Sequence, residues 1–164
     1  MRAVITGANR GMGLEFCIQL KERGAEVIAL CRQSSPALDS LGVEVHTGID
    51  LSSDTLPRRL KEALGGRSID CLVNNAGILR RESLDEMSFT RIEEQFRVNA
   101  LGPLKVTHSL LDLLEPGAKV ALITSRMGSI GDNTSGSRYG YRMSKAALNI
   151  AGVSLAHDLK PNGV

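Results

Sequence analysis

The glycine-rich segment Thr6–Gly13 (Thr-Gly-Ala-Asn-Arg-Gly-Met-Gly) limits the possible folds more than any other part of this sequence. It follows the apolar run 3–5 and precedes a segment, residues 14–23, whose apolar residues recur at about helical spacing. The pattern predicts a strand, a tight turn and a helix. Glycine suits such a turn because it adopts backbone angles that other residues resist, and because a Cβ would block a phosphate. Since the start of a helix favours an anion, the segment predicts a phosphate-bearing cofactor.

Apolar runs further along the chain predict four more strands, with helical segments between most of them. The predicted strands are 26–31, 43–47, 69–73 and 120–124, and the predicted helices are 55–64, 90–114 and 141–159, with a short loop at 34–36. The strands are apolar throughout rather than at every second residue, which is typical of a parallel sheet covered on both faces. We therefore expect a doubly wound, Rossmann-like α/β sheet with strand order 3-2-1-4-5.

Polar motifs follow all five predicted strands. They are the glycine turn, Arg32, Asp50, the run Asn75-Ala76-Gly77 and the pair Thr124-Ser125. In a doubly wound sheet the ligand lies along the carboxyl ends of the strands, near the point where the strand order reverses. Any one of these clusters alone would be ordinary loop chemistry, but five at successive strand ends predict a binding site at this edge.

Tyr141 and Lys145 are four residues apart in a predicted helix, so their side chains share one face. A free tyrosine has a pKa of about 10, and a neighbouring cation lowers it by favouring the phenolate. The pair therefore predicts an acid or base that works near neutral pH. The alternative is an ordinary surface pair at this spacing. Ser125, at the end of the strand 120–124, would point its hydroxyl into the same cleft and hydrogen-bond a carbonyl oxygen.

In this order, the glycine turn, the run 74–77, Ser125 and the Tyr141/Lys145 pair resemble the short-chain dehydrogenase/reductase family over the whole chain. The strings 124–128 and 141–145 look most like the branch of the C-factor and the sniffer-type carbonyl reductases. The resemblance implies an oxidoreductase that moves hydride between a nicotinamide and a carbonyl or alcohol. It implies that Tyr141 is the acid/base, that Ser125 polarises the carbonyl, and that Lys145 lowers the pKa of the tyrosine and holds the nicotinamide ribose.

Asn99 matches the fourth catalytic residue of that family. Pro103 lacks the N–H group that would bond the carbonyl of Asn99, four residues earlier in the predicted helix 90–114. The resemblance implies that the main chain at this asparagine holds a water in a proton relay to the lysine, which a free carbonyl would suit. The alternative is a packing kink at Gly102-Pro103 with no catalytic role.

The cofactor contacts follow from the strand ends and from the resemblance. The predicted cofactor-binding residues are Gly7, Asn9, Arg10, Gly11, Met12, Gly13, Arg32, Asp50, Leu51, Asn75, Ala76, Gly77, Tyr141 and Lys145. An acidic residue after the second strand commonly binds the adenosine ribose of NAD(H), but here Cys31 and Arg32 hold that place. With no carboxylate there, and with Arg32 and Arg10 able to bind a phosphate, we predict NADP(H) in preference to NAD(H).

Two features depart from the family pattern. Ser125 and Tyr141 lie further apart than is usual in the family, so Ser129 and Tyr139 are alternatives. We keep Tyr141 because the residue four positions after Tyr139 is Met143 rather than a lysine. We keep Ser125 because it ends a strand. The second departure is the end of the chain at residue 164, where relatives continue into further strands and a substrate lid. We expect residues 1–164 to form one domain, C-terminally truncated, with the strand 120–124 as a bare apolar edge.

Composition limits the partners and the compartment. The 20 basic and 18 acidic residues are spread along the chain, so we expect no nucleic-acid binding. Three scattered cysteines fit neither a disulfide framework nor a metal site and indicate a reducing compartment. The spacing of His46, His108 and His157 is not that of metal ligands. No apolar run has the length of a membrane span. We expect a cytoplasmic protein without a metal.

Together these observations predict an NADPH-dependent reductase of aldehydes or ketones that uses Tyr141 as general acid. The alternative is a dinucleotide-binding signalling protein of the C-factor type, in which turnover is not the function. The sequence does not identify the substrate.

The last two long helices carry more apolar residues than one face of the sheet can cover, which predicts a homodimer through these helices. The residues are Leu104, Leu110, Leu111, Leu114, Ala147, Ile150 and Leu155.

Overall fold

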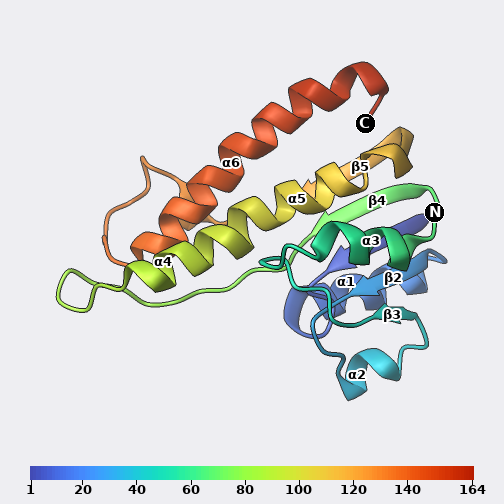
Figure 1. The fold of residues 1–164 in the computed structure, drawn as a ribbon, viewed down its shortest axis with the longest axis horizontal. Helices are drawn as coiled ribbons and strands as arrows, with labels where there is room; N and C mark the ends of the chain where they lie inside the picture. The colour runs from blue at the N-terminus through green and yellow to red at the C-terminus, as the bar shows by residue number, and fades with distance from the viewer.

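A five-stranded parallel sheet forms the centre of the molecule in a computed structural model that describes residues 1–164 (Figure 1). Its order, β3-β2-β1-β4-β5, confirms the predicted doubly wound topology. The strands are β1 (Arg2–Thr6), β2 (Glu26–Leu30), β3 (Glu44–His46), β4 (Ile69–Asn74) and β5 (Leu114–Leu122), and every neighbouring pair is parallel. The order reverses between β1 and β4, which places the predicted binding edge at their carboxyl ends.

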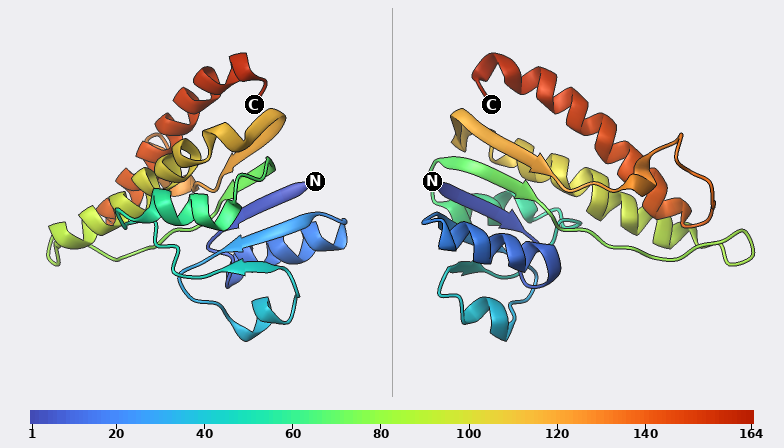
Figure 2. Two further views of the ribbon diagram at one scale, coloured as in Figure 1. Left: turned by 45° about the vertical axis from the view of Figure 1, so that its right-hand side comes forward. Right: turned by 180° about the vertical axis from the view of Figure 1, so that it is seen from behind.

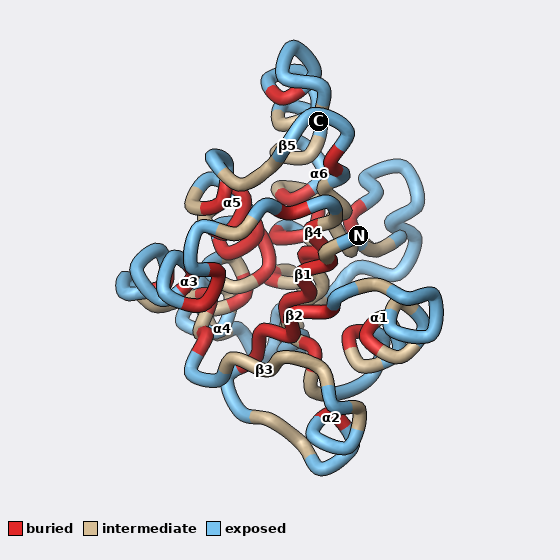
Figure 3. Tube along the Cα trace, turned by 90° about the vertical axis from the view of Figure 1, so that its right-hand side faces the viewer, coloured by how far each residue is buried: buried red, intermediate tan, exposed pale blue.

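Helices cover both faces of this sheet, as the end-on view in Figure 3 and the side views in Figure 2 show. They are α1 (Gly11–Glu22), α2 (Pro36–Asp39), α3 (Leu56–Leu64), α4 (Phe89–Phe96), α5 (Gly102–Ser109) and α6 (Tyr139–Leu159). None of them combines the length and the apolar character that crossing a membrane requires.

The alternation of side chains along each strand divides the core into two clusters. In β1, Val4 joins the cluster that α3 and α5 cover, whereas Ala3 and Ile5 join the cluster that α1 and α2 cover; all three are fully buried. Strands buried on both faces have no polar side to show, which explains the continuous apolar runs in the sequence.

The predicted helix 90–114 is four pieces in the structure: α4, a π-helical segment, α5 and the single 3₁₀ turn Leu111–Leu113. Between α4 and α5 lies a π-helical segment, η1 (Arg97–Leu101), in which the N–H of Gly102 donates to the carbonyl of Arg97, five residues back. Pro103 follows directly and has no N–H to continue an α-helical ladder, which gives a physical reason for the change of pitch. The helix then ends at Ser109, five residues earlier than expected.

The strand predicted at 120–124 in fact runs from Leu114 to Leu122. Its first half contains Pro116 and Gly117, which read as strand breakers in the sequence. β5 pairs only with β4 and is an edge strand, where a proline is tolerated because one side needs no ladder hydrogen bonds. Where a loop was expected at 34–36, Ser35 accepts a hydrogen bond from the N–H of Leu38 (3.2 Å) and caps the short helix α2.

The apolar surface behind the predicted homodimer needs a correction. Leu110 is fully buried in the core and Leu114 begins β5, so neither is free to face a partner. Leu104, Leu111 and Ile150 do remain exposed, the last at 66%. The assembly state stays a prediction with this smaller set of residues.

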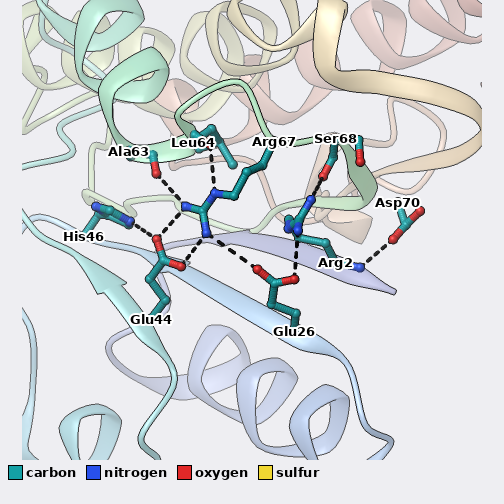
Figure 4. Close-up of polar contacts among 9 residues, drawn as sticks. All are labelled: Arg2, Glu26, Glu44, His46, Ala63, Leu64, Arg67, Ser68 and Asp70. Carbon is teal, nitrogen blue, oxygen red and sulfur yellow. Dashed lines mark hydrogen bonds and ion pairs between the residues drawn. The ribbon is translucent and has the colours of Figure 1, made fainter.

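Charged side chains join the amino ends of the strands, on the side away from the glycine turn (Figure 4). Arg67 donates to both carboxylate oxygens of Glu44 (2.7 and 2.6 Å) and lies 3.6 Å from Glu26, which also pairs with Arg2 at 3.0 Å. The hydrogen bond from Arg67 lowers the pKa of Glu44 to about 2, with a smaller contribution from His46 and against the opposing effect of burial. The Glu44 carboxylate is therefore charged in the folded state at neutral pH.

Candidate active site

The glycine turn after β1 is shaped by both backbone angle and space. Gly7 and Gly11 have φ values of +67° and +53°, which glycine adopts without strain. Gly13 has an ordinary φ, but a Cβ on it would lie 2.2 Å from the carbonyl oxygen of Gly7 and 2.5 Å from Nδ2 of Asn75. Helix α1 therefore begins in direct contact with the turn, and only glycine fits at that contact.

Side-chain hydrogen bonds tie this turn to the end of β4. Oγ1 of Thr6 accepts from the N–H groups of Asn75 (3.0 Å) and Ala76 (3.1 Å), and Nδ2 of Asn75 donates to the carbonyls of Thr6 (3.0 Å) and Gly7 (3.2 Å). The Asn75 side chain, predicted to bind cofactor, is thus engaged in holding the turn. Its hydrogen bonds fix the two strand ends at the point where the sheet order reverses.

The first turn of α1 has no side-chain cap and no acidic residue. Its N–H groups point away from the helix without intrahelical acceptors, and the helix dipole adds positive potential there. The site therefore fits a phosphate group, as the glycine turn predicts.

A cleft of about 480 Å³ opens at this edge of the sheet. It brings together most of the predicted cofactor-binding residues: Gly7, Asn9, Arg10, Gly11, Met12, Arg32, Asp50, Leu51, Asn75, Ala76 and Gly77. The cleft is also lined by residues that the sequence analysis did not name as binding residues: Cys31, Ile49, Ser52, Ile78, Glu94 and Val98. Three predicted cofactor-binding residues do not line the cleft: Gly13, Tyr141 and Lys145. Gly13 is buried behind the turn, and the other two belong to α6.

Charges are arranged at the end of the cleft below β2 and β3. Asp50 accepts hydrogen bonds from the N–H (2.9 Å) and hydroxyl (2.7 Å) of Ser52, and these bonds lower its pKa against the opposing effect of burial, with a further contribution from Arg32. Arg10 and Arg32 are exposed and form no ion pair. Two guanidinium groups are thus available to an anion.

Lys145, in the second turn of α6, is only 4% exposed, and its ammonium donates to the carbonyl of Ile123 (2.7 Å), just after β5. Burial lowers its pKa. The ammonium lies 5.8 Å from the centre of the Tyr141 ring, within the range of electrostatic interaction with it. The helix thus brings the cation and the phenol to one place, as their spacing predicts.

Asn99, in the π-helical segment, joins α6 to the loop after β4. Its Oδ1 accepts from the N–H of Ile78 (2.8 Å), and its Nδ2 donates to the carbonyl of Ile78 (2.8 Å) and the hydroxyl of Ser144 (3.0 Å). Its side chain is fully buried. The predicted role of its main-chain carbonyl in a proton relay stays a prediction.

Gly77 connects the cleft to this group. It lines the cleft, and a Cβ on it would lie 3.3 Å from Oδ1 of Asn99 and 3.7 Å from Nζ of Lys145. Only Gly77 therefore separates this part of the cleft wall from the buried ammonium of Lys145.

Ser125 lies three residues beyond the end of β5, rather than at its last residue, and caps a single 3₁₀ turn, Arg126–Gly128. Its Oγ accepts from the N–H of Met127 at 3.1 Å. The turn packs on α6 through Gly128, where a Cβ would lie 2.8 Å from the backbone of Lys145. The alternative, Ser129, is exposed and lies beyond this turn.

This geometry defines a class: a Rossmann-like protein with a glycine turn at the switch point of its sheet and a tyrosine-lysine pair on the helix that follows β5. A family model described as short chain dehydrogenase matches residues 1–164, so the chain belongs to this family. The family resemblance of the sequence motifs is thereby confirmed, and with it the assignment to the oxidoreductases.

Individual relatives match over different lengths. The chain is 38% identical to 1-hydroxy-2-glutathionyl-2-methyl-3-butene dehydrogenase of Rhodococcus sp. (strain AD45) over 98% of its own length and 72% of the relative's. It is 48% identical to the C-signal protein of Myxococcus xanthus over 98 residues, which cover 58% of this chain and 59% of that protein.

Solved structures agree with the fold. The carbonyl reductase Sniffer of D. melanogaster superposes with a TM-score of 0.90 at 28% identity, covering 99% of this chain and 77% of that one. A carbonyl reductase from Pseudomonas aeruginosa PAO1, solved in complex with NADP, superposes with a TM-score of 0.86 at 34% identity over 96% of this chain and 76% of that one.

Proposed function

We propose that this chain binds NADP(H) in the cleft and reduces an aldehyde or ketone to the alcohol, with Tyr141 as general acid. The observation that carries the proposal is the position of Gly77, which lines the cleft and lies against both Asn99 and Lys145. A nucleotide in the cleft would thus end beside the lysine that shares a helix face with Tyr141. The NADP complex of the related carbonyl reductase supports the same choice of cofactor.

The residues of the cleft fit this cofactor. The uncapped first turn of α1 supplies N–H groups for the diphosphate. Arg10 and Arg32 are exposed, unpaired and beside the cleft, so they suit the additional phosphate that distinguishes NADP(H) from NAD(H). When bound, NADPH supplies the hydride that the carbonyl carbon accepts.

The protein's own groups handle the oxygen and the proton. The Ser125 hydroxyl hydrogen-bonds the substrate oxygen, and Tyr141 transfers its phenolic proton to that oxygen as the carbon is reduced, which leaves a phenolate. The ammonium of Lys145, held by the carbonyl of Ile123, stabilises that negative charge. A proton from solvent then restores the phenol, and the net change is the addition of one hydride and one proton to the carbonyl.

The second candidate is a dinucleotide-binding signalling protein, which the identity to the C-signal protein favours. The two functions differ in what Tyr141 does. For an enzyme, the phenol is essential for turnover; for a signalling protein, cofactor binding is sufficient.

A homodimer through the exposed residues of α5 and α6, and a cytoplasmic location consistent with three free cysteines, are part of the proposal.

The test is a screen for NADPH oxidation against aldehydes, ketones and quinones, with the parent protein and its Tyr141→Phe variant. The parent should turn over at least one substrate class, and the variant should bind NADPH but lose turnover. Cofactor binding without turnover on any carbonyl in the parent would favour the signalling function.

A further inference from the structure

Glu82 is a buried carboxylate to which the proposed chemistry assigns no role. It lies in the segment between β4 and α4, is 3% exposed, and forms no ion pair. A buried charge without a counter-ion is costly unless hydrogen bonds replace the water that it loses. The partners of Glu82 therefore indicate why the fold keeps it there.

Those partners belong to α4 and α6. Oε1 of Glu82 accepts from Nε2 of Gln95 (2.5 Å), and Oε2 accepts from the N–H of Gly140 (3.3 Å), 58 residues away. The carbonyl of Glu82 accepts from the N–H of Arg138 (2.8 Å). Gly140 is in the first turn of α6, where N–H groups lack helical acceptors and the dipole favours negative charge. Glu82 thus caps α6 from a distant segment.

The backbone that enters α6 is strained. Ser137 and Arg138 have φ values of +53° and +52°, and they are the only non-glycine residues with positive φ. Such conformations persist only where the surroundings hold them, and they gather at functional sites. Here the guanidinium of Arg142 donates to the carbonyls of Gly136 (3.1 Å) and Ser137 (3.2 Å), and Glu82 holds the N–H of Arg138.

Gln95 fixes the carboxylate. It is fully buried on α4, and its Oε1 accepts from the N–H of Arg80 (2.8 Å). A Cβ on Gly140 would lie 2.3 Å from Nε2 of Gln95, so the start of α6 is pressed against this amide. Figures 1 and 2 show the segment before α4 meeting the first turn of α6 at the end of the molecule remote from the amino ends of the strands.

Gln95 and Asn99 are one helical turn apart and act alike. Asn99 bridges Ile78 to Ser144, and Gln95 bridges Arg80 to Glu82 and so to Gly140. Tyr141 follows Gly140 directly and precedes Ser144, whose hydroxyl donates to the Tyr141 carbonyl (2.9 Å). The two amide bridges therefore hold the backbone of α6 on either side of the phenol.

We propose that Glu82 is a positioning residue for the reaction: its carboxylate, oriented by Gln95, fixes the first turn of α6 and so holds Tyr141 in place for proton transfer. The inference rests on the proposed function of Tyr141 as general acid. A displacement of about 1 Å at a reacting group, caused from a distance, can lower turnover by as much as about 10²-fold.

The first test is Glu82→Gln, which keeps the shape but turns one acceptor into a donor that faces Gln95 or Gly140. We expect kcat for carbonyl reduction to fall by about tenfold or more, while the Kd for NADPH, measured by the fluorescence of the bound cofactor, changes less than about twofold. The control is Glu86→Gln, an exposed residue of the same segment whose side chain makes no hydrogen bond; its kcat should equal that of the parent. A Glu82→Gln variant with the parent's kcat, or one whose NADPH affinity falls as much as its kcat, overturns the proposal.

Two further variants separate this inference from the proposed function. The double variant Glu82→Gln/Gln95→Glu restores a donor and an acceptor across the contact and should regain part of the lost kcat; no recovery counts against the proposal. In a Tyr141→Phe background, Glu82→Gln should cause no further loss, because its effect passes through the phenol. If the Tyr141→Phe variant keeps normal turnover, the assignment of Tyr141 as general acid has failed. If Tyr141→Phe loses turnover but Glu82→Gln keeps the parent's turnover, only the positioning role of Glu82 has failed.

Discussion

Gly13→Ala tests whether the contact between α1 and the glycine turn is as close as the structure shows. The new Cβ would lie 2.2 Å from the carbonyl oxygen of Gly7 and 2.5 Å from Nδ2 of Asn75. A carbon and an oxygen approach to about 3.3 Å without strain, so the helix or the turn must move by roughly 1 Å. The hydrogen bonds of Asn75 to the turn oppose that movement from one side, and the buried residue Cys17 anchors α1 from the other.

The magnitude follows from these contacts. Forcing one extra methyl group into a packed site costs about 1–3 kcal/mol of stability. If the movement also removes one charge-assisted hydrogen bond from the helix start to the cofactor diphosphate, about 1.5–3 kcal/mol of binding energy is lost, which corresponds to roughly a ten- to hundredfold higher Kd.

The assay pairs urea denaturation with titration of NADPH. Gly131→Ala is the matched control, because a Cβ there meets nothing within 4 Å and its φ is not positive, so stability and Kd should stay at the parent's values. A Gly13→Ala variant that unfolds and binds like Gly131→Ala would show that α1 does not touch the turn as described.

Three further predictions concern the cofactor, the proton and the strand starts. Arg32→Ala and Arg10→Ala should each reduce the preference for NADP(H) by about 1.5–3 kcal/mol, measured as Kd for both cofactors; a parent that binds NAD(H) equally well would contradict the assignment. Tyr141→Phe should lower turnover by about two to four orders of magnitude while NADPH still binds, and near-normal turnover would refute its role. Glu44→Gln should lower the free energy of unfolding by about 1 kcal/mol, an allowance made for a half-exposed ion pair. Because folding lowers the pKa of Glu44 from 4.5 to about 2, this stabilisation is present above pH 4.5 and disappears as the pH falls through 2, so denaturation curves at pH 7 and pH 2 should show it only at the first.

The centre of the sheet was predictable because β1, β2 and β4 are largely buried. Continuous apolar runs mark β1, β2 and β4, and the rule for doubly wound sheets then gives the order. The start of β5 was not predictable, because Pro116 and Gly117 look like strand breakers and are tolerated only at an edge, which is a property of the assembled sheet. The π segment was missed for a related reason, since Pro103 indicates a disturbed helix but not which pitch replaces it.

The cleft was predictable where its residues follow strands, because parallel topology alone brings carboxyl ends together. Glu94 and Val98 also line it, yet they come from α4 and η1, whose approach depends on tertiary packing. The contact between Glu82 and Gly140 depends on tertiary packing in the same way and could not be predicted from the sequence. No spacing rule connects residues that lie 58 positions apart in a loop and a helix.

The packing of α6 also bears on which tyrosine is the acid. Gly140 faces α4, where a Cβ would collide with Gln95 at 2.3 Å and with Ile92 at 2.9 Å. Successive residues of an α-helix are about 100° apart, so Tyr139 and Tyr141 leave the helix on opposite sides of this contact. Only Tyr141 is one turn from Lys145, and the Lys145 ammonium lies 5.8 Å from the centre of the Tyr141 ring. The glycine between the two tyrosines therefore fixes the rotation of the helix, and that rotation favours Tyr141 over Tyr139 as the proton donor.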